Sequence, residues 1–239
     1  MKALRALPLL LAVAGMVMLA LAGIGTRFGV WHYRTGLSML RYSAYVGIAA
    51  AVVCILALLV TRPSGGSRVA LVIGLLLSAL TVGVPYRFSQ TVKRVPPIHD
   101  ITTDMTDPPT FVAVLPLRAS ATNAALYAGD SVAALQRAAY PEVRPLMLPV
   151  PPLAAFDRAV AAAKAMGWEI VAGDSPSGRL EATATTTWFG FKDDVVVRIR
   201  SANSGSRVDV RSVSRVGRSD VGANAARIVR YLDVLQRQR

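Results

Sequence analysis

The chain has 239 residues, enough for one or two domains, and combines 53% hydrophobic with only 17% charged residues and a formal net charge of +13. This composition argues against an ordinary soluble domain, and the single cysteine, Cys54, excludes an intrachain disulfide and a zinc site built on cysteine pairs. Positions 1–86 hold seven basic and no acidic residues. Because this basic excess flanks apolar segments, the charge does not indicate a nucleic-acid binder.

Three apolar stretches without a charged side chain lie at residues 7–26, 43–61 and 69–86. Each is close to the roughly 20 residues with which a helix crosses a hydrocarbon core of about 30 Å. Residues 1–88 are therefore predicted to form a transmembrane region of three helices. For the first stretch a cleavable signal peptide is the alternative, since Lys2 and Arg5 precede it, but its length and the two further stretches favour a retained span.

The orientation of the spans is nearly balanced by charge, because basic residues flank both ends. The linker 62–68 has the composition of a tight cytoplasmic turn, so we expect the N-terminus inside and the C-terminal domain outside. Gly74 and Ser78 form a small-xxx-small pair that permits close helix packing, although such residues are also common in membrane helices. The loop 27–42, where aromatic residues and His32 accompany arginines, is expected to be a short interfacial segment.

Residues 89–144 are rich in proline, which removes backbone donors and biases the preceding residues to extended geometry. They are predicted to be an irregular segment that wraps the soluble domain, with one short helix at about 131–139.

Residues 145–239 have the regular patterns of an α+β core. A short strand at 146–148 precedes a helix that opens at Pro151 and Pro152 and runs to Met166, where Gly167 ends it. Alternating strands are then expected, and a final helix capped by Ser219 or Asp220 runs to about 236. The expected strands cover 168–172, 179–189, 194–201 and 207–216. The expected fold is a three-helix transmembrane region plus a C-terminal α+β domain with a small antiparallel sheet packed by helices.

Several strings in the soluble half are distinctive as a set. They are IHDITTD at 98–104, DPP at 107–109, YP at 140–141, FGFKDD at 189–194, RSVSRVG at 211–217 and SDVGAN at 219–224, followed by Arg227 and Ile228. Together they resemble the family called domain of unknown function 1499, over roughly residues 95–237. The resemblance implies a domain that follows a few membrane spans in many members, and it brings no established reaction.

The first candidate site is the run that contains His99, Asp100, Asp104 and Asp107. One imidazole and three carboxylates within nine residues could bind a hard cation or pair a base with an orienting acid. The spacing matches no EF-hand loop, and zinc usually needs more nitrogen or sulfur ligands. The structural alternative is that these side chains bond nearby backbone in turns.

Two further candidates lie on the strands. Asp193 and Asp194 are adjacent, so they point to opposite sheet faces and cannot form a dyad, and Trp188 beside them could line a pocket or simply pack in the core or at an interface. If Arg198 and Arg200 share a face with Asp209, several guanidinium groups converge there and could bind a phosphate or carboxylate. Arg211 and Arg215 belong to the same predicted face. The alternative is a surface lattice of Arg–Asp pairs.

The fourth candidate is Asn224, which falls on the apolar stripe of the last helix. A buried amide must be hydrogen-bonded, so we expect it to bond backbone in the bend at 214–219, with a ligand contact as the second choice.

The sequence therefore predicts an integral protein of the bacterial inner membrane, with an extracytoplasmic domain that binds an anionic ligand or a protein partner. Candidate partners are the lipid bilayer, an anionic lipid, a glycan or an envelope protein, and the spans offer a route to an oligomer. The alternative is a metal-assisted hydrolase centred on His99, Asp100 and Asp104. No phosphate loop, nucleophile elbow, HExxH or CxxC occurs, and no cofactor or nucleic acid is expected.

Overall fold

A computed structural model describes residues 2–203 and 205–238, which form two compact units. The first unit covers the described residues up to 93 together with the short segment 187–190, and the second covers the remainder.

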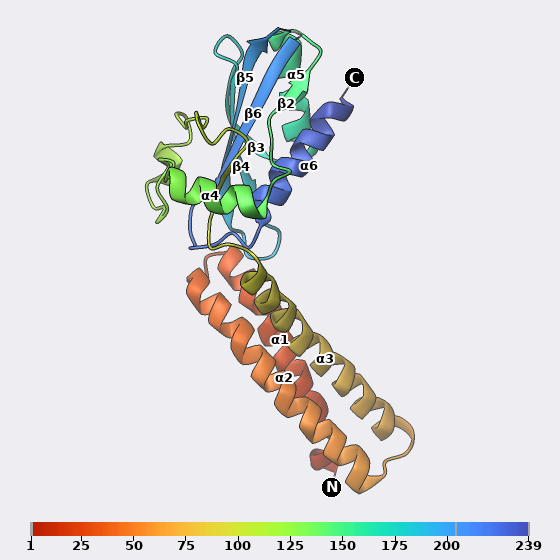
Figure 1. Cartoon of the computed structure of the whole chain (residues 1–239). Coiled ribbons are helices and arrows are strands. Elements are labelled where there is room, and N and C mark those ends of the chain that lie inside the picture. The colour runs from red at the N-terminus through yellow and green to blue at the C-terminus, as the bar shows by residue number, and fades with distance from the viewer. Residues whose placement is uncertain (1, 204, 239) are drawn as a thin grey trace. The chain divides into compact units, whose positions relative to one another are not determined.

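The first unit contains three helices, α1 (Lys2–Arg27), α2 (Tyr33–Thr61) and α3 (Gly65–Arg94) (Figure 1). Among the described residues these three are long and apolar enough to cross a membrane, so the predicted three-helix region is confirmed. With a rise of about 1.5 Å per residue, the 29 residues of α2 extend about 44 Å, which exceeds the hydrocarbon thickness. Each predicted apolar stretch is therefore part of a longer helix.

The expected interfacial loop at 27–42 is wrong in extent, because α2 begins at Tyr33 and leaves only five residues between the helices. His32 caps α2, and its Nδ1 accepts a hydrogen bond from the backbone N–H of Arg34 at 3.3 Å. The close approach of α2 to α1 near this start requires Gly36, where an added Cβ would lie 2.5 Å from the carbonyl oxygen of Ala22. A larger residue would push α2 away from α1.

Small residues bring the helices of this unit together. Gly74 and Ser78 on α3 are both buried, and an added Cβ on Gly74 would lie 2.8 Å from the Sγ atom of Cys54 on α2. Gly47 packs in the same way against Thr81. The close approach that the small-xxx-small pair permits is thus realised in the bundle.

The second unit is built on a six-stranded antiparallel sheet, in the order β1-β6-β5-β4-β3, with β2 also paired to β6. The predicted antiparallel α+β domain is confirmed. A short strand inside the proline-rich segment, β1, was not expected. The strands are β1 (Asp100–Thr102), β2 (Leu146–Leu148), β3 (Glu169–Asp174), β4 (Arg179–Thr185), β5 (Lys192–Ala202) and β6 (Gly205–Ser214).

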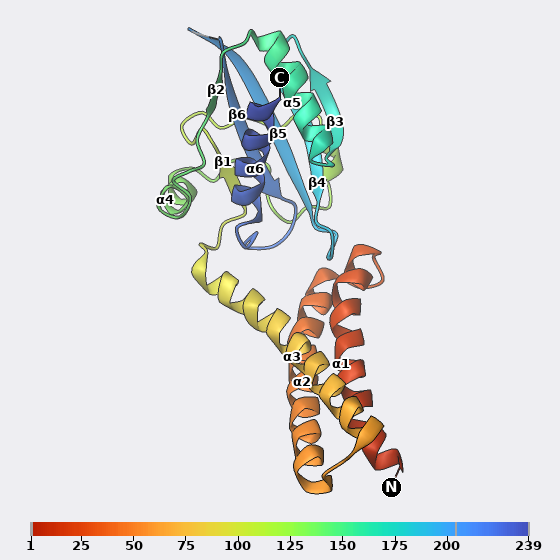
Figure 2. The same cartoon turned by 90° about the vertical axis from the view of Figure 1, so that its right-hand side faces the viewer.

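Helices α5 (Pro152–Ala165) and α6 (Ala223–Arg237) lie on the same face of this sheet (Figure 2). The inward side chains of β4 and β5 pack beneath them in one apolar core. This core includes Leu180, Ala182, Ala184, Val195, Val197, Ile199, Phe156, Ile228 and Leu235. Helix α6 starts later than expected, because Val221 and Gly222 have left-handed φ angles of 55° and 81° that interrupt it.

The opposite sheet face is covered by the irregular chain after β1, which includes a 3-10 turn, η1 (Pro116–Arg118). Phe111 and Val114 of this segment form a small second core with Val196 and Val213 of the sheet. Helix α4 (Asp130–Ala139) follows it, and its Gln136 bonds both backbone groups of Thr102 on the edge strand β1, at 3.0 and 2.6 Å. The sheet therefore has helices on one face and wrapped chain on the other.

Candidate functional site

The sheet face that turns away from α5 and α6, called the polar face below, carries a dense set of charged side chains. Alternation along β5 and β6 places them there, and the antiparallel register puts Arg198 opposite Asp209 and Arg200 opposite Arg207. The predicted convergence of arginines on one face is therefore present, and three separate groups of ion pairs divide it.

The first group, called the outer arginine cluster, consists of Arg198, Arg200 and Arg207 with Asp104, Asp107 and Asp209. Asp209 is fully buried and lies 3.2 Å from the Nη2 atom of Arg198. Arg207 Nη2 lies 2.9 Å from Asp104 Oδ2. Arg200 keeps 44% of its side chain exposed while it lies 3.0 Å from Asp107. Three guanidinium groups are thus balanced by three carboxylates at the solvent boundary.

The turn after β1 supplies two of these carboxylates. Asp104 accepts hydrogen bonds from the backbone N–H groups of Thr106 and Asp107, at 3.1 and 3.0 Å. Partial burial acts to raise the pKa of Asp104, but these N–H donors and the cations of Arg207 and Arg198 outweigh it, so the pKa lies below its usual range. Asp104 thus bonds nearby backbone in a turn, as the structural alternative expects, and it also forms ion pairs with the arginines of the sheet.

The second group is the buried pair Arg211–Asp100. Arg211 donates from Nε and Nη2 to the two carboxylate oxygens of Asp100, at 2.9 and 2.7 Å. The Cζ atom of its guanidinium group lies 5.2 Å from the ring centroid of Phe111 and 5.4 Å from that of Tyr127. Burial, the largest cause, together with the nearby Asp100 carboxylate raises the pKa of Tyr127 to about 12. This pair fixes β1 and the wrapping chain on β6.

The third group surrounds Asp194, whose carboxylate is fully buried. It accepts hydrogen bonds from Arg118 at 2.7 Å, from Thr183 at 2.8 Å and from Arg215 at 2.9 and 2.7 Å. Burial favours the protonated form, yet the donors Arg215, Thr183 and Arg118 outweigh it and lower the pKa of Asp194. Two arginines around one aspartate leave this group with a surplus positive charge.

One carboxylate of the polar face was missed in the sequence. Glu181 on β4 is buried and accepts the backbone N–H groups of Val112 and Val114, both at 2.9 Å. The wrapping chain has no regular structure here that could pair these two backbone N–H groups, so Glu181 pairs them and anchors the chain on the sheet.

On the helix-covered face, Asp193 and Asn224 meet Arg227 of α6. Arg227 donates to Asp193 Oδ2 and to Asn224 Oδ1. Asp193 therefore points to the helix-covered face and Asp194 to the polar face, the opposite directions that their adjacency predicts. Asn224 Nδ2 donates to the His99 carbonyl and to the Ser214 hydroxyl, both at 3.0 Å. The expectation that Asn224 bonds backbone of the 214–219 bend is wrong in that detail, because it bonds a side chain of the bend and the backbone before β1.

The residues proposed for a metal centre do not come together. His99 is half-buried and its Nδ1 lies 3.2 Å from the Arg218 carbonyl oxygen, while Asp100 and Asp104 are held by different arginines. In the part of the chain that the structure describes, no group of three or more His, Cys, Asp or Glu side chains could hold a metal ion. The geometry therefore gives no support to the hydrolase alternative.

Trp188 is also separate from these groups. The strand expected to reach 189 ends at Thr185, so Trp188 lies in the following loop, where it packs edge-on against Phe189 with ring centroids 5.0 Å apart.

A small pocket of about 120 Å³ opens beside the outer arginine cluster. Arg198 and Arg179 line it, together with Ser177, Thr110 and the Asp107–Pro109 turn. The Nε atom of Arg198 is buried without a hydrogen-bond partner among the described residues. Arg179 contacts Glu181 and Asp174 at 3.4 and 3.7 Å, longer than most pairs of this face. Two guanidinium groups with spare donors thus border a space of oxyanion size.

Arg207 and Arg179 were not among the candidate residues chosen from the sequence, although strand alternation places both on the polar face. Arg118 could not have been found this way, because the irregular chain around it has no period from which to infer its direction.

Comparison with known proteins gives one match. A sequence model of the family described as protein of unknown function (DUF1499) matches residues 100–235, which contain β1 to β6 and nearly all of α6. No curated protein and no solved structure matches.

Proposed function

The chain belongs to the DUF1499 family, and from that premise we propose that it is a membrane-anchored binding protein whose α+β domain holds a small anionic group on its polar face. The three apolar helices supply the anchor. The ligand class is a molecule with a phosphate or carboxylate group.

The pocket beside Arg198 and Arg179 is the observation that carries this proposal. Arg198 lines the pocket, and its buried Nε N–H has no partner among the described residues, so we propose that an acceptor in the pocket supplies the missing charge-assisted hydrogen bond. Thr110 adds a hydroxyl group at the same place, whereas the Ser177 hydroxyl already donates to Asp174 at 2.6 Å.

The proposal includes a bacterial inner-membrane location with the domain on the extracytoplasmic side. Support comes from the tight turn between α2 and α3, which suits the cytoplasmic side, and from the odd number of spans. On that side an anionic lipid, a glycan or an envelope protein would be the ligand, and the spans would form any oligomer.

The test uses the full chain in detergent micelles and inorganic phosphate as the probe, measured by isothermal titration at low and high salt. We expect saturable binding that weakens with salt. Arg179→Gln, which removes one donor of the pocket, should weaken phosphate binding by about tenfold.

Arg237→Gln is the matched control, since it removes the same charge from an exposed i,i+4 pair with Asp233. It should bind phosphate as the unmodified chain does. Absence of phosphate binding, or equal losses in both variants, would refute the proposed site.

A further inference from the structure

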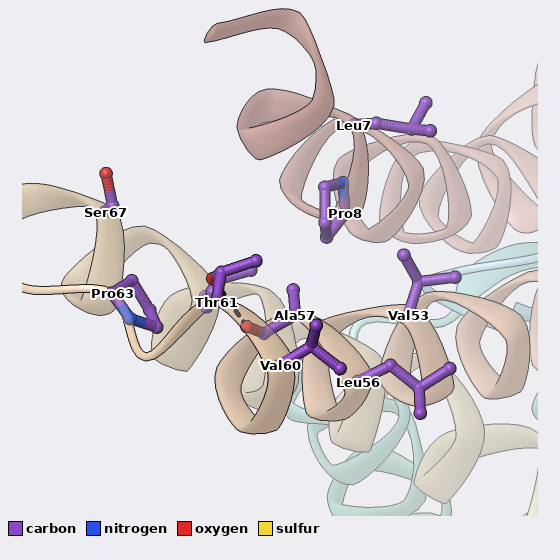
Figure 3. Close-up of a pocket in the computed structure, with 10 residues that line it drawn as sticks. Leu7, Pro8, Val53, Leu56, Ala57, Val60, Thr61, Pro63 and Ser67 are labelled. Carbon is purple, nitrogen blue, oxygen red and sulfur yellow. Dashed lines mark hydrogen bonds between the residues drawn. The ribbon is translucent and has the colours of Figure 1, made fainter. Parts of the chain in front are cut away.

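A second, larger pocket lies within the transmembrane unit. It has a volume of about 510 Å³, within the range of ligand pockets. Figure 3 shows Leu7 and Pro8 of α1 on one side of it and Val53, Leu56 and Val60 of α2 on the other. The wall is apolar almost throughout, so its natural content is hydrocarbon.

The polar residues of this pocket gather at one end. These are Thr61 at the end of α2 and Ser67 in the first turn of α3, and Pro63 of the intervening turn lies beside them (Figure 3). Thr61 Oγ1 already donates to the carbonyl oxygen of Ala57 at 2.7 Å, so it adds no unmet polar demand inside the pocket. Ser67 supplies the second hydroxyl at this end of the pocket.

This end of the bundle is also basic. Arg62 lies between Thr61 and Pro63, and Arg68 directly follows Ser67. Both arginines are exposed, and neither has an ion-pair partner among the residues that the structure describes. The sequence places Lys2 and Arg5 just before Leu7, and no acidic residue precedes Asp100.

We propose that this pocket binds one anionic phospholipid, with an acyl chain between α1 and α2 and the phosphate at Arg62, Ser67 and Arg68. The apolar wall matches the chain, and the unpaired guanidinium groups at the polar end match the headgroup. This site is independent of the phosphate pocket on the sheet.

Native mass spectrometry of the full chain in micelles tests this, with phosphatidylglycerol and phosphatidylcholine of identical acyl chains supplied in equal amounts. We expect one retained lipid with a strong preference for phosphatidylglycerol. The double variant Arg62→Gln with Arg68→Gln should reduce that preference about tenfold. Its control, Arg87→Gln with Arg94→Gln, removes the same charge near the other end of α3 and should leave the preference unchanged.

A second pair of variants tests the apolar part. Ala57→Phe places a ring in the pocket and should reduce retention of both lipids, whereas Val52→Phe adds the same ring at an exposed position of α2 outside it. The proposal is overturned if the unmodified chain retains both lipids equally, if both arginine double variants behave alike, or if Ala57→Phe retains lipid as Val52→Phe does.

Discussion

Arg118 and Asp194 are 76 residues apart in the sequence, yet Nη1 of the first lies 2.7 Å from Oδ2 of the second. The arginine comes from the 3-10 turn in the wrapping chain, and the aspartate comes from β5, so this pair closes irregular chain onto the sheet. Arg215 completes the group from the end of β6. This buried carboxylate therefore joins the wrapping chain to the sheet, as Glu181 does through Val112 and Val114.

Replacement of this carboxylate should be severe. Asp194→Asn leaves Arg118 and Arg215 without a counter-charge in a buried position, which should lower the free energy of unfolding by about 3–5 kcal/mol. Urea unfolding of the full chain in micelles, followed by tryptophan fluorescence, measures the loss. Asp233→Asn breaks an exposed pair with Arg237 and should cost less than about 1 kcal/mol. Similar losses in the two variants would contradict this role of Asp194.

The same groups predict how stability depends on pH. Since the folded domain lowers the pKa of Asp194 and Asp104, these carboxylates stabilise it above the unfolded-state pKa of about 3.9, and this contribution is lost as the pH falls through that value and below it. Unfolding free energy measured from pH 6 down to about pH 3 should therefore fall. In Asp194→Asn the fall should be shallower, because one of the titrating groups is absent.

Gln136 should protect the edge strand β1. Its amide occupies both backbone groups of Thr102, as a neighbouring strand would, so Gln136→Leu leaves a buried N–H and C=O unpaired. We expect faster hydrogen exchange at the Thr102 amide and a loss of about 1–3 kcal/mol. Leu135→Ala, at an exposed position of the same helix, should leave this exchange unchanged. Equal protection of Thr102 in both variants would show that α4 does not shield β1.

Periodicity predicted the regular half of the fold because each strand residue has a fixed side. Alternation placed Val195, Val197 and Ile199 beneath the helices and Arg198 and Arg200 on the other face, as the structure has them. The three-residue strand β1 is too short to show a period, and its place depends on long-range partners such as Arg211.

The site was predictable only in part for the same reason. Sequence alternation brings the arginines of β5 and β6 to one face, but the partners Asp104, Asp107 and Arg118 come from irregular chain that carries no directional pattern. The proposed grouping of His99 with the neighbouring aspartates failed because closeness in sequence does not give closeness of side chains. Alternating residues around β1 reach different elements, so Asp100 contacts Arg211 while His99 stays at the surface.

Asn224 should also contribute to stability, though less than the buried carboxylate of Asp194, because it joins α6 to two other parts of the domain, β6 and the chain before β1. Its Oδ1 accepts from Ser212 at 2.6 Å, and its Nδ2 donates to Ser214 and to the carbonyl of His99. Asn224→Ala removes all of these at once and leaves buried groups unsatisfied, so we expect a loss of about 1–3 kcal/mol in urea unfolding. Gln236→Ala removes an exposed amide from the same helix and should have almost no effect. If the two alanine variants unfold at the same urea concentration, the amide at 224 does not contribute to holding α6 on β6.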